Sequence, residues 1–382
     1  MASSFARSVR SVSCSPFRRH MLMTKFWTFT SPQNIRTNIN SANIHAKTPN
    51  FPRIPPDQAR PINANKFLIF SFIGGIISQM LCDNQIFAAP LAGVTDRPFR
   101  RVVREFSPNA PMVTEMISCH SIVGAHKNCL RNFDNYADEG SVGAQIFGAD
   151  VNLMADAARI LQDAGAKWID INMGCPVPKV ATRANAGAHL MRDHRQAGKI
   201  MAAVVNAVQI PVSIKTRLGW DEAHMDWRDL INIAADCGVR FAALHGRTRA
   251  QLYLGVAVHP DVSACPIPII ANGDIKSADD LKGLDTLGYA GAMIGRGLMG
   301  RPWILNQMIG GRDPENIGDV VLRHLEYAIE YYGEKTAVPM FRKHAAWYSA
   351  GMPNSSEFRI RVNQIDDADV LKVAIREFWG MI

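Results

Sequence analysis

Eight short apolar runs, each ending near a glycine or a polar residue, constrain the fold of this chain more than any other feature. Several runs are apolar almost without interruption, as expected for parallel strands buried on both faces. Segments with helical spacing of apolar residues separate many of them. Strand–helix alternation repeated eight times predicts an α/β fold, a (β/α)8 TIM barrel. The runs are 86–93, 111–118, 141–148, 168–175, 211–219, 241–248, 267–275 and 291–297, and the helical patterns are 150–165, 197–208, 227–238 and 277–288.

A doubly wound open sheet is the alternative fold, but no Gly-x-Gly-x-x-Gly pattern follows the first run, which disfavours it. After Pro302 the pattern becomes helical, with helices expected at 320–333 and 336–352 and no strand-like alternation. We therefore expect a barrel domain over residues 84–312 and a small all-helical domain over 313–382.

The first 83 residues differ from the rest, because they are rich in Ser, Asn, Pro and Arg and contain no acid before Asp57. This composition is typical of an organelle transit peptide. A disordered tail, or a true start at Met80, would explain it as well. The apolar segment 67–81 is shorter than the ~20 residues of a membrane span, so we read it as part of the barrel bottom or of the extension, with a membrane anchor as the weakest option. We expect a cytoplasmic protein, or a mitochondrial one if the leader is real.

The net charge of +8 suggests a polyanionic partner, but its distribution does not. Eight of the 42 basic residues precede Asp57, which leaves 34 basic against 34 acidic residues in the remainder. Binding of nucleic acid by the body must therefore depend on a local patch. The seven cysteines include no Cys-x-x-Cys pair, which argues against a disulfide framework and a zinc site and predicts no metal.

Polar residues fall in the last part of seven of the strand runs, or just beyond it. In a barrel these positions share the carboxyl-end face, where active sites lie. Any one of them is more often a capping or solvated residue than a functional one. Together they predict a ligand site. The residues are Pro90, Gln145, Asn172, Cys175, Lys215, His245, Arg247, Asn272, Asp274 and Arg296.

The last two runs carry glycines where a backbone would approach a ligand closely, in "ANGDI" and "MIGRG". Loops after the seventh and eighth strands are the usual phosphate site of such barrels. Backbone N–H groups of Gly273, Gly295 and Gly297, with the Arg296 guanidinium, would hold a phosphate. Ordinary turn glycines are the alternative reading.

A flat heterocycle would suit the remaining polar groups. Lys215 ends an apolar strand and needs a partner such as a flavin edge or a phosphate. Gln145 and Asn272 offer amide donors and acceptors for a ring edge, and the small-residue backbone at Pro90–Ala92 offers a surface for the ring.

Cys175 stands in "WIDINMGCPVPKV", between Gly174 and Pro176 at the exit from a strand. A free thiol has a pKa near ~8.5 and is mostly protonated at neutral pH. It can therefore donate a proton where a carbanion-like centre forms. A buried, inert cysteine is the alternative.

Seven motifs in order resemble the tRNA-dihydrouridine synthases, most closely the bacterial B type, from about Ile86 to the C-terminus. They are "AAPLAGVTDRPFR", "INMGCPVPKV", "AGAHLMRD", "IKTRLGW", "LHGRTRAQLYLG", "PIIANGDI" and "MIGRGLMGRPWI". The resemblance implies an FMN-dependent reductase in which NADPH reduces the flavin, the flavin gives hydride to C6 of a D-loop uridine, and a cysteine protonates C5.

Carried over by motif, that cysteine is Cys175, and Asn172 and Arg247 face the uridine. The same resemblance implies a helical tRNA-binding domain, in which Arg342 and Lys343 would contact RNA. We expect a monomer without metal or membrane contact. The implied FMN contacts are Pro90, Leu91, Ala92, Gln145, Lys215, His245, Asn272, Gly273, Asp274, Gly295 and Arg296.

Two features qualify the resemblance. The segment 255–268 is about one helical turn shorter than in the family, which puts the helix after the sixth strand in doubt. The basic and aromatic residues of 341–348 suit an RNA surface, but a solvated basic face over buried aromatics would give the same pattern. Two other functions remain open: a flavin oxidoreductase of a free pyrimidine, resembling dihydroorotate dehydrogenase, and a non-catalytic tRNA-binding protein.

Overall fold

The computed structural model describes residues 85–124, 139–182 and 184–382. The expectations for the N-terminal extension, including the leader and the apolar segment 67–81, lie outside the described residues, as do Cys14, Cys82 and Cys129. Within the described residues, we find no helix with the length and apolar character that crossing a membrane requires.

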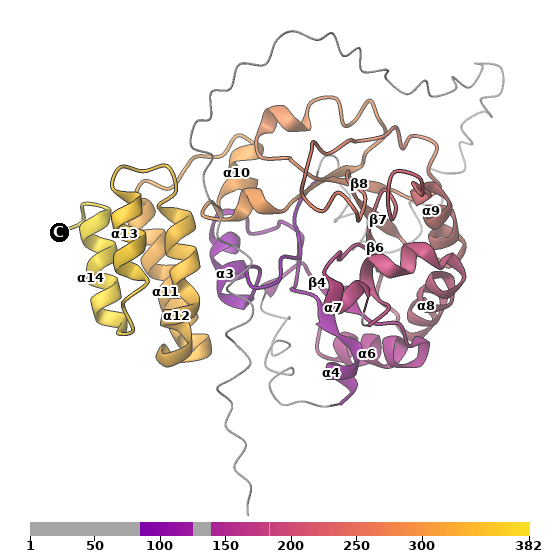
Figure 1. Cartoon of the computed structure of the whole chain (residues 1–382), viewed down its shortest axis with the longest axis horizontal. Helices are drawn as coiled ribbons and strands as arrows, with labels where there is room; N and C mark the ends of the chain where they lie inside the picture. The colour runs from indigo at the N-terminus through magenta and orange to yellow at the C-terminus, as the bar shows by residue number, and fades with distance from the viewer. Residues whose placement is uncertain (1–84, 125–138, 183) are drawn as a thin grey trace, which may run out of the picture. The chain divides into compact units, whose positions relative to one another are not determined.

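The strands close into a parallel barrel (Figure 1). Strand β1 pairs with β2 on one side and β9 on the other, and β2 pairs onward with β4, so that eight strands complete the circle. This confirms the predicted barrel. The strands are β1 (Gln85–Ala88), β2 (Met112–Val113), β3 (Ile117–Ser118), β4 (Val142–Phe147), β5 (Trp168–Asn172), β6 (Val212–Arg217), β7 (Phe241–His245), β8 (Ile269–Asn272) and β9 (Gly291–Ile294).

The second predicted strand is divided. Residues 111–118 form β2 and β3, and β3 pairs with the carboxyl end of β4. Large side chains fill the barrel: Trp168 is fully buried and its ring lies 6.4 Å from that of Phe241. Gly143 on the neighbouring strand makes room for it, since a Cβ there would lie 2.0 Å from the Trp168 ring.

Aspartates begin three of the barrel helices. Asp96, Asp150 and Asp193 each accept a hydrogen bond from a backbone N–H in the first turn of the helix that follows. The patterns at 150–165, 197–208 and 227–238 are confirmed as α6, α8 and α9. The helices of this part are α3 (Arg97–Phe106), α4 (Cys119–Val123), α6 (Val151–Asp163), α7 (Pro178–Ala181), α8 (His194–Ala207), α9 (Trp227–Asp236) and α10 (Ile304–Met308), with 3-10 turns η5 (Gly187–Arg192), η6 (Ala278–Leu281) and η7 (Arg296–Leu298).

The helix predicted at 277–288 is wrong, because only the 3-10 turn η6 forms there. Gly283 and Gly288 adopt φ values of +82° and +83°, a left-handed conformation that interrupts a helix. The shortness of segment 255–268 put the helix after the sixth strand in doubt, and this helix is indeed absent from the described chain. Residues 246–268, all of them described, contain no helix between β7 and β8.

Four helices follow the barrel and form what we call the helical segment, residues 317–378. Its own apolar core includes Val321, Leu325, Phe341 and Leu371, and Val102 on α3 joins this core. The yellow helices in Figure 1 belong to this segment. They are α11 (Ile317–Tyr332), α12 (Glu334–Tyr348), α13 (Ser355–Val362) and α14 (Ala368–Phe378).

Candidate active site

Polar residues that end neighbouring strands meet on one edge of the barrel. The parallel register pairs Asn172 on β5 with Lys215 on β6, and His245 on β7 with Asn272 on β8. Because parallel strands bring their carboxyl ends to one edge, the side chains predicted from strand ends come together there. We call this edge the carboxyl rim.

The loop that follows β5, residues 173–177, carries Cys175, and we call it the cysteine loop. Asn172 connects this loop to the interior of the rim. Its side-chain Nδ2 donates to Gln145 Oε1 at 2.8 Å, and its Oδ1 accepts the N–H of Cys175 at 2.9 Å and that of Gly174 at 3.2 Å. Gln145 Nε2 in turn donates to Asp170 Oδ2 at 2.5 Å. A series of hydrogen bonds therefore links the backbone of Cys175 through Asn172 and Gln145 to the buried carboxyl group of Asp170.

Cys175 follows β5 and is half-buried. Burial raises the pKa of its thiol, while the cationic groups of Arg217 and Lys215 act to lower it. Because the pKa lies above its ordinary value, the thiol keeps its proton at neutral pH. The group can act as a proton donor, and the two cations are placed to favour the thiolate that donation would leave.

Asn272 is the centre of a second network. Its Oδ1 accepts from Lys215 Nζ at 2.8 Å and from His245 Nδ1 at 2.9 Å, and its Nδ2 donates to the Met293 carbonyl at 2.7 Å. Burial lowers the pKa of Lys215 to about 8. Burial, and then the charge of Lys215, lowers the pKa of His245 to about 2, so its ring is neutral.

The neutral His245 ring carries its proton on Nδ1, because Asn272 Oδ1 can only accept. Its Nε2 is then a lone-pair acceptor. That atom is buried and has no hydrogen-bond partner among the described residues. A buried acceptor without a partner is costly, which points to a donor supplied by a ligand.

Arg247 is 2% exposed and lies beneath the loop that follows β7. Its Nη2 donates to the Gly255 carbonyl at 2.7 Å and to Asp274 Oδ2 at 2.5 Å, and its Nε donates to the Leu254 carbonyl at 3.0 Å. Its Nη1 is buried and lacks a partner within the described chain. The residue expected to face a uridine thus also holds a loop and an aspartate in place.

Asp274 joins two arginines on the rim. Its Oδ1 accepts from Arg296 Nη2 at 3.1 Å, while its Oδ2 accepts from Arg247. Burial alone would raise the pKa of Asp274, but the hydrogen bond and charge of Arg247, with the charge of Arg296, hold it below its ordinary value. The Asp274 carboxylate therefore stays ionised and fixes Arg296 at the end of β9.

Glycines follow β8 and β9 on the carboxyl rim. In the described chain, no acceptor is present for the N–H groups of Gly273 and Gly295. Gly273 has a φ of +121°, and a Cβ there would lie 2.8 Å from Ala257. Two open N–H groups beside Arg296 are the chemistry of a phosphate site. The residues on the rim thus fit a phosphorylated, flat cofactor.

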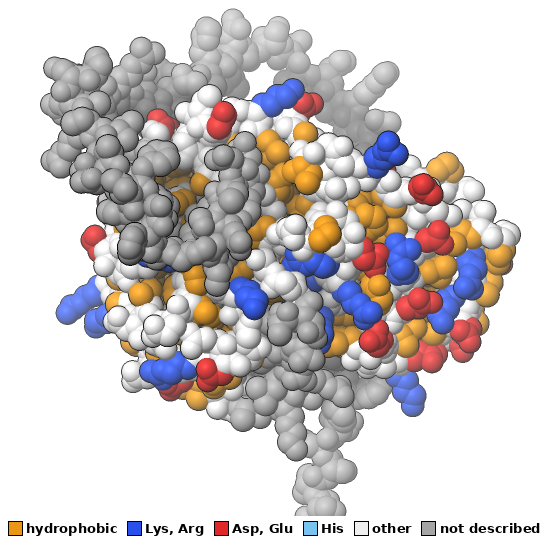
Figure 2. Space-filling view, turned by 180° about the vertical axis from the view of Figure 1, so that it is seen from behind, with side chains coloured by type: hydrophobic (Ala, Val, Ile, Leu, Met, Phe, Trp, Pro, Cys, Tyr) orange, Lys and Arg blue, Asp and Glu red, His pale blue; other side chains and the backbone are white. Residues whose placement is uncertain are grey.

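The two predicted RNA contacts on α12 are arranged differently. Arg342 donates to the Ile365 carbonyl at 2.8 Å and also pairs with Asp366, so its head group is occupied within the helical segment. The neighbouring Lys343 points toward Gly93, in the loop that follows β1, rather than away from the barrel. Basic and acidic side chains are interspersed over the right-hand part of Figure 2, where this segment lies.

Burial of the aromatics in 341–348 supports the alternative reading of that stretch. His344 and Tyr348 are 4% exposed each. Tyr348 belongs to the core of the helical segment, and the His344 ring lies 5.7 Å from that of Phe341, another member of this core. The basic and aromatic residues of this stretch do not form one continuous exposed surface.

Three residues on or near the rim were not anticipated from the sequence. Asp170 is 1% exposed, and burial raises the pKa of its carboxyl group. Arg217 Nε donates to the Gly174 carbonyl at 2.8 Å and bridges the cysteine loop to Thr248 and Leu252. Glu115 accepts from the N–H of Gly93. The available signal was a charged residue inside or beside an apolar run, as in "WIDIN".

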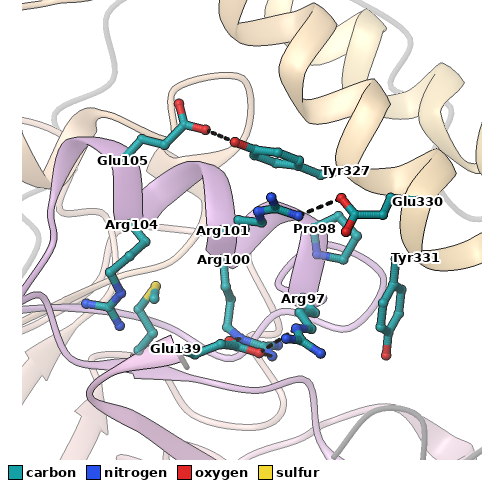
Figure 3. A pocket seen from close by; sticks show the side chains of 11 residues that line it. Arg97, Pro98, Arg100, Arg101, Arg104, Glu105, Glu139, Tyr327, Glu330 and Tyr331 are labelled. Carbon is teal, nitrogen blue, oxygen red and sulfur yellow. Dashed lines mark hydrogen bonds and ion pairs between the residues drawn. The ribbon is translucent and has the colours of Figure 1, made fainter. Parts of the chain in front are cut away.

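Residues 85–124, 139–182 and 184–382 contain no group of three or more His, Cys, Asp or Glu side chains placed to hold a metal. A cavity of about 580 Å³ lies between α3 and α11, lined by Arg97, Arg101, Tyr327 and Glu330 among others (Figure 3). None of the strand-end residues predicted for the site lines it.

This chain is similar in sequence to known proteins over most of its length. Residues 87–378 match the family described as dihydrouridine synthase (Dus). A probable tRNA-dihydrouridine synthase from Rickettsia bellii is 39% identical over 321 residues, covering 80% of this chain and 98% of that protein.

A tRNA-dihydrouridine synthase B from Pseudomonas putida is 38% identical over 319 residues, covering 80% of this chain and 94% of that protein. Among solved structures, morphinone reductase aligns with a TM-score of 0.46 at 12% identity, over 61% of this chain and 87% of that one.

Proposed function

This chain belongs to the dihydrouridine synthase family, and on that premise we propose that it reduces the C5–C6 double bond of a uridine in the D-loop of tRNA. It is a flavin-dependent oxidoreductase. The finer proposal is that FMN is the cofactor and NADPH the reductant. The reaction consumes NADPH and one proton and yields NADP⁺ and dihydrouridine.

The observation that supports the cofactor proposal most strongly is the pair of buried, unpartnered atoms, His245 Nε2 and Arg247 Nη1. A buried acceptor and a buried cationic donor, two residues apart in the chain at the end of β7, fit a ligand that carries both hydroxyl or imide donors and acceptor oxygens. Lys215 suits the electron-rich edge of an isoalloxazine ring. The N–H groups of Gly273 and Gly295, with Arg296, suit its phosphate.

The remaining proposed contacts follow the rim. Backbone at Pro90, Leu91 and Ala92 would lie against the ring. Gln145, Asn272 and Asp274 would bind it or hold the residues that do. Bound FMN supplies the hydride for C6, as cofactors generally supply the demanding chemistry.

The protein supplies the proton and the orientation of the base. We assign the proton that C5 receives to the Cys175 thiol, which burial keeps protonated at neutral pH. Asn172 holds the cysteine loop through the N–H groups of Gly174 and Cys175. The thiolate left behind faces Lys215 and Arg217 and regains its proton from solvent. Asn172 and Arg247 would contact the uridine, which must leave its stack to reach the rim.

The proposal includes the organisation of the chain. The barrel over 84–312 would hold the flavin and the reacting base, and the helices over 313–382 would bind tRNA, with Arg342 among the contacts. The protein would work as a monomer in the cytoplasm, or in the mitochondrion if residues 1–83 include a leader.

Incubation with NADPH and an unmodified tRNA transcript tests this function. We expect purified protein to be yellow with bound FMN and to add two hydrogens to one uridine, read by mass spectrometry of the digested tRNA. Free uridine and uracil, tested in parallel, should remain unreduced. Reduction of free uridine or uracil but not of tRNA would show that tRNA is not the substrate. A colourless protein that takes up no FMN would show that this chain is not an FMN-dependent enzyme.

A further inference from the structure

The loop that joins β1 to α3, Pro90–Asp96, is held by a half-buried acid from another strand segment. The N–H of Gly93 donates to Oε1 of Glu115, which stands between β2 and β3. Within the loop, Leu91 N–H donates to Thr95 Oγ1 at 2.9 Å. Gly93 has a φ of +74°, a conformation that favours glycine. The shape of the loop therefore depends on Glu115.

Two side chains of the helical segment reach the same loop. Tyr332, at the end of α11, donates its hydroxyl to Asp96 Oδ2 at 2.9 Å. Lys343, on α12, places its Nζ 3.4 Å from the position that a Cβ on Gly93 would occupy. The helical segment thus contacts the loop at Gly93 and at Asp96.

The charges around the loop are costly to bury. Burial raises the pKa of Asp96, although its carboxyl group also caps α3 through the Phe99 N–H at 3.0 Å. Burial, and next the charge of Asp96, raises the pKa of Glu115, while the Lys343 ammonium acts to lower it.

Asp96 is buried and Glu115 and Lys343 are half-buried, and charges withdrawn from water contribute little to stability compared with apolar packing. Their presence beneath the loop is better explained by a role in fixing its position.

We infer that Glu115, Asp96, Tyr332 and Lys343 form a clamp through which the helical segment holds the β1–α3 loop in place. This inference rests on the proposed function, because the same loop carries Pro90, Leu91 and Ala92 of the proposed flavin site. The four are positioning residues, since none is proposed to touch the reacting atoms. They would link docking of RNA on the helical segment to the geometry of the rim.

Three variants and a matched control test the clamp. Glu115→Gln keeps an acceptor for Gly93 but removes the charge, Lys343→Met removes the ammonium at similar length, and the third variant combines the two. The control is Arg101→Met. Arg101 pairs with Glu330 at 2.7 Å between α3 and α11 (Figure 3), but these side chains are 50% and 67% exposed, so the pair is a surface ion pair.

Each clamp variant is measured for kcat, for KM with tRNA, for the FMN dissociation constant and for the flavin absorption spectrum. We expect kcat to fall by about 10- to 100-fold, the order expected when reacting groups are misplaced by about 1 Å. FMN binding should weaken, the spectrum should shift, and the tRNA KM should change by less than about twofold. The double variant should lose less than the product of the single losses, because the residues are coupled.

Several results would overturn the clamp. If Lys343→Met raises the KM for tRNA and leaves kcat unchanged, Lys343 is an RNA contact only. If the variants behave like Arg101→Met while the wild type binds FMN and forms dihydrouridine, the clamp is wrong and the proposed function stands. If the wild type does neither, both fall. Should Lys343→Met not fold, Tyr332→Phe, which removes one hydroxyl, is read by the same criteria.

Discussion

The carboxyl rim and the helical segment both bury neutral histidines, yet in different surroundings. His245 on the rim is bonded to Asn272 and lies among cationic groups. His324 on α11 is bonded to the Tyr348 hydroxyl at 3.2 Å and packs 4.6 Å from the ring of His344. Burial lowers the pKa of all three side chains.

An unpartnered nitrogen does not by itself distinguish the two regions. His344 also leaves Nδ1 without a partner in the described chain, but aromatic rings enclose it, including Phe99, Phe341 and Trp347. His245 lies instead on an edge where amides, cations and open N–H groups converge. The same residue type completes a core in one region and faces a proposed ligand in the other.

The largest expected contrast is between two half-buried cysteines. Cys175→Ala should reduce turnover on tRNA by about 10²- to 10⁴-fold, the usual contribution of a positioned proton donor, while FMN remains bound. Cys237→Ala, at the end of α9, is the control and should turn over normally. The measurement is the steady-state rate of dihydrouridine formation in tRNA for each variant, followed by mass spectrometry. Normal turnover by Cys175→Ala would mean that C5 takes its proton from another group.

Two arginines with similar bonding provide the next comparison. Arg247 and Arg342 each donate hydrogen bonds to the carbonyl oxygen of a loop residue and to the side chain of an aspartate. Arg247→Met removes a buried partner and should lower the free energy of unfolding by about 3 kcal/mol and weaken FMN binding. The partner of Arg342 is 85% exposed, so Arg342→Met should cost about 1 kcal/mol or less and leave FMN binding intact.

Urea unfolding and FMN titration of both arginine variants provide these values. Equal losses of stability, or an Arg247→Met protein that binds FMN as tightly as the wild type, would remove the distinction between rim and helical segment.

A smaller effect concerns pH. The pKa of His324 is lowered to about 3, whereas an unfolded histidine titrates near ~6.5. Below pH ~6.5 the His324 side chain is protonated in the unfolded chain but stays neutral in the folded chain. The free energy of unfolding therefore falls as the pH decreases toward 3 and is fully regained above ~6.5. At pH 5.5 each such histidine costs about 1.4 kcal/mol. Thermal unfolding between pH 5 and 8 should show a flatter pH dependence for His324→Leu. An unchanged slope would exclude His324 as a source.

The barrel and most of the rim were predictable from the sequence for one physical reason. Buried parallel strands are nearly continuous apolar runs, and their carboxyl ends must meet on one edge, so Lys215, His245 and Asn272 could be grouped without coordinates. The helix expected at 277–288 failed because apolar spacing does not reveal that Gly283 is left-handed.

Contacts between distant segments could not be predicted in this way. Arg217 and Glu115 act on backbone groups 43 and 22 residues away, at Gly174 and Gly93. The head group of Arg342 is taken by the backbone 23 residues further on. Spacing within a motif contains no information on such partners, and a single sequence does not reveal them.

We propose that the carboxyl rim holds the flavin through groups that have no partner of their own within the described chain. The most direct test of this proposal is titration of purified protein with FMN, followed by quenching of flavin fluorescence, for the wild type, His245→Leu and His324→Leu. We expect one FMN per chain for the wild type, binding at least about tenfold weaker for His245→Leu, equivalent to about 1.4 kcal/mol, and unchanged binding for His324→Leu. Equal affinity of His245→Leu and the wild type would contradict it.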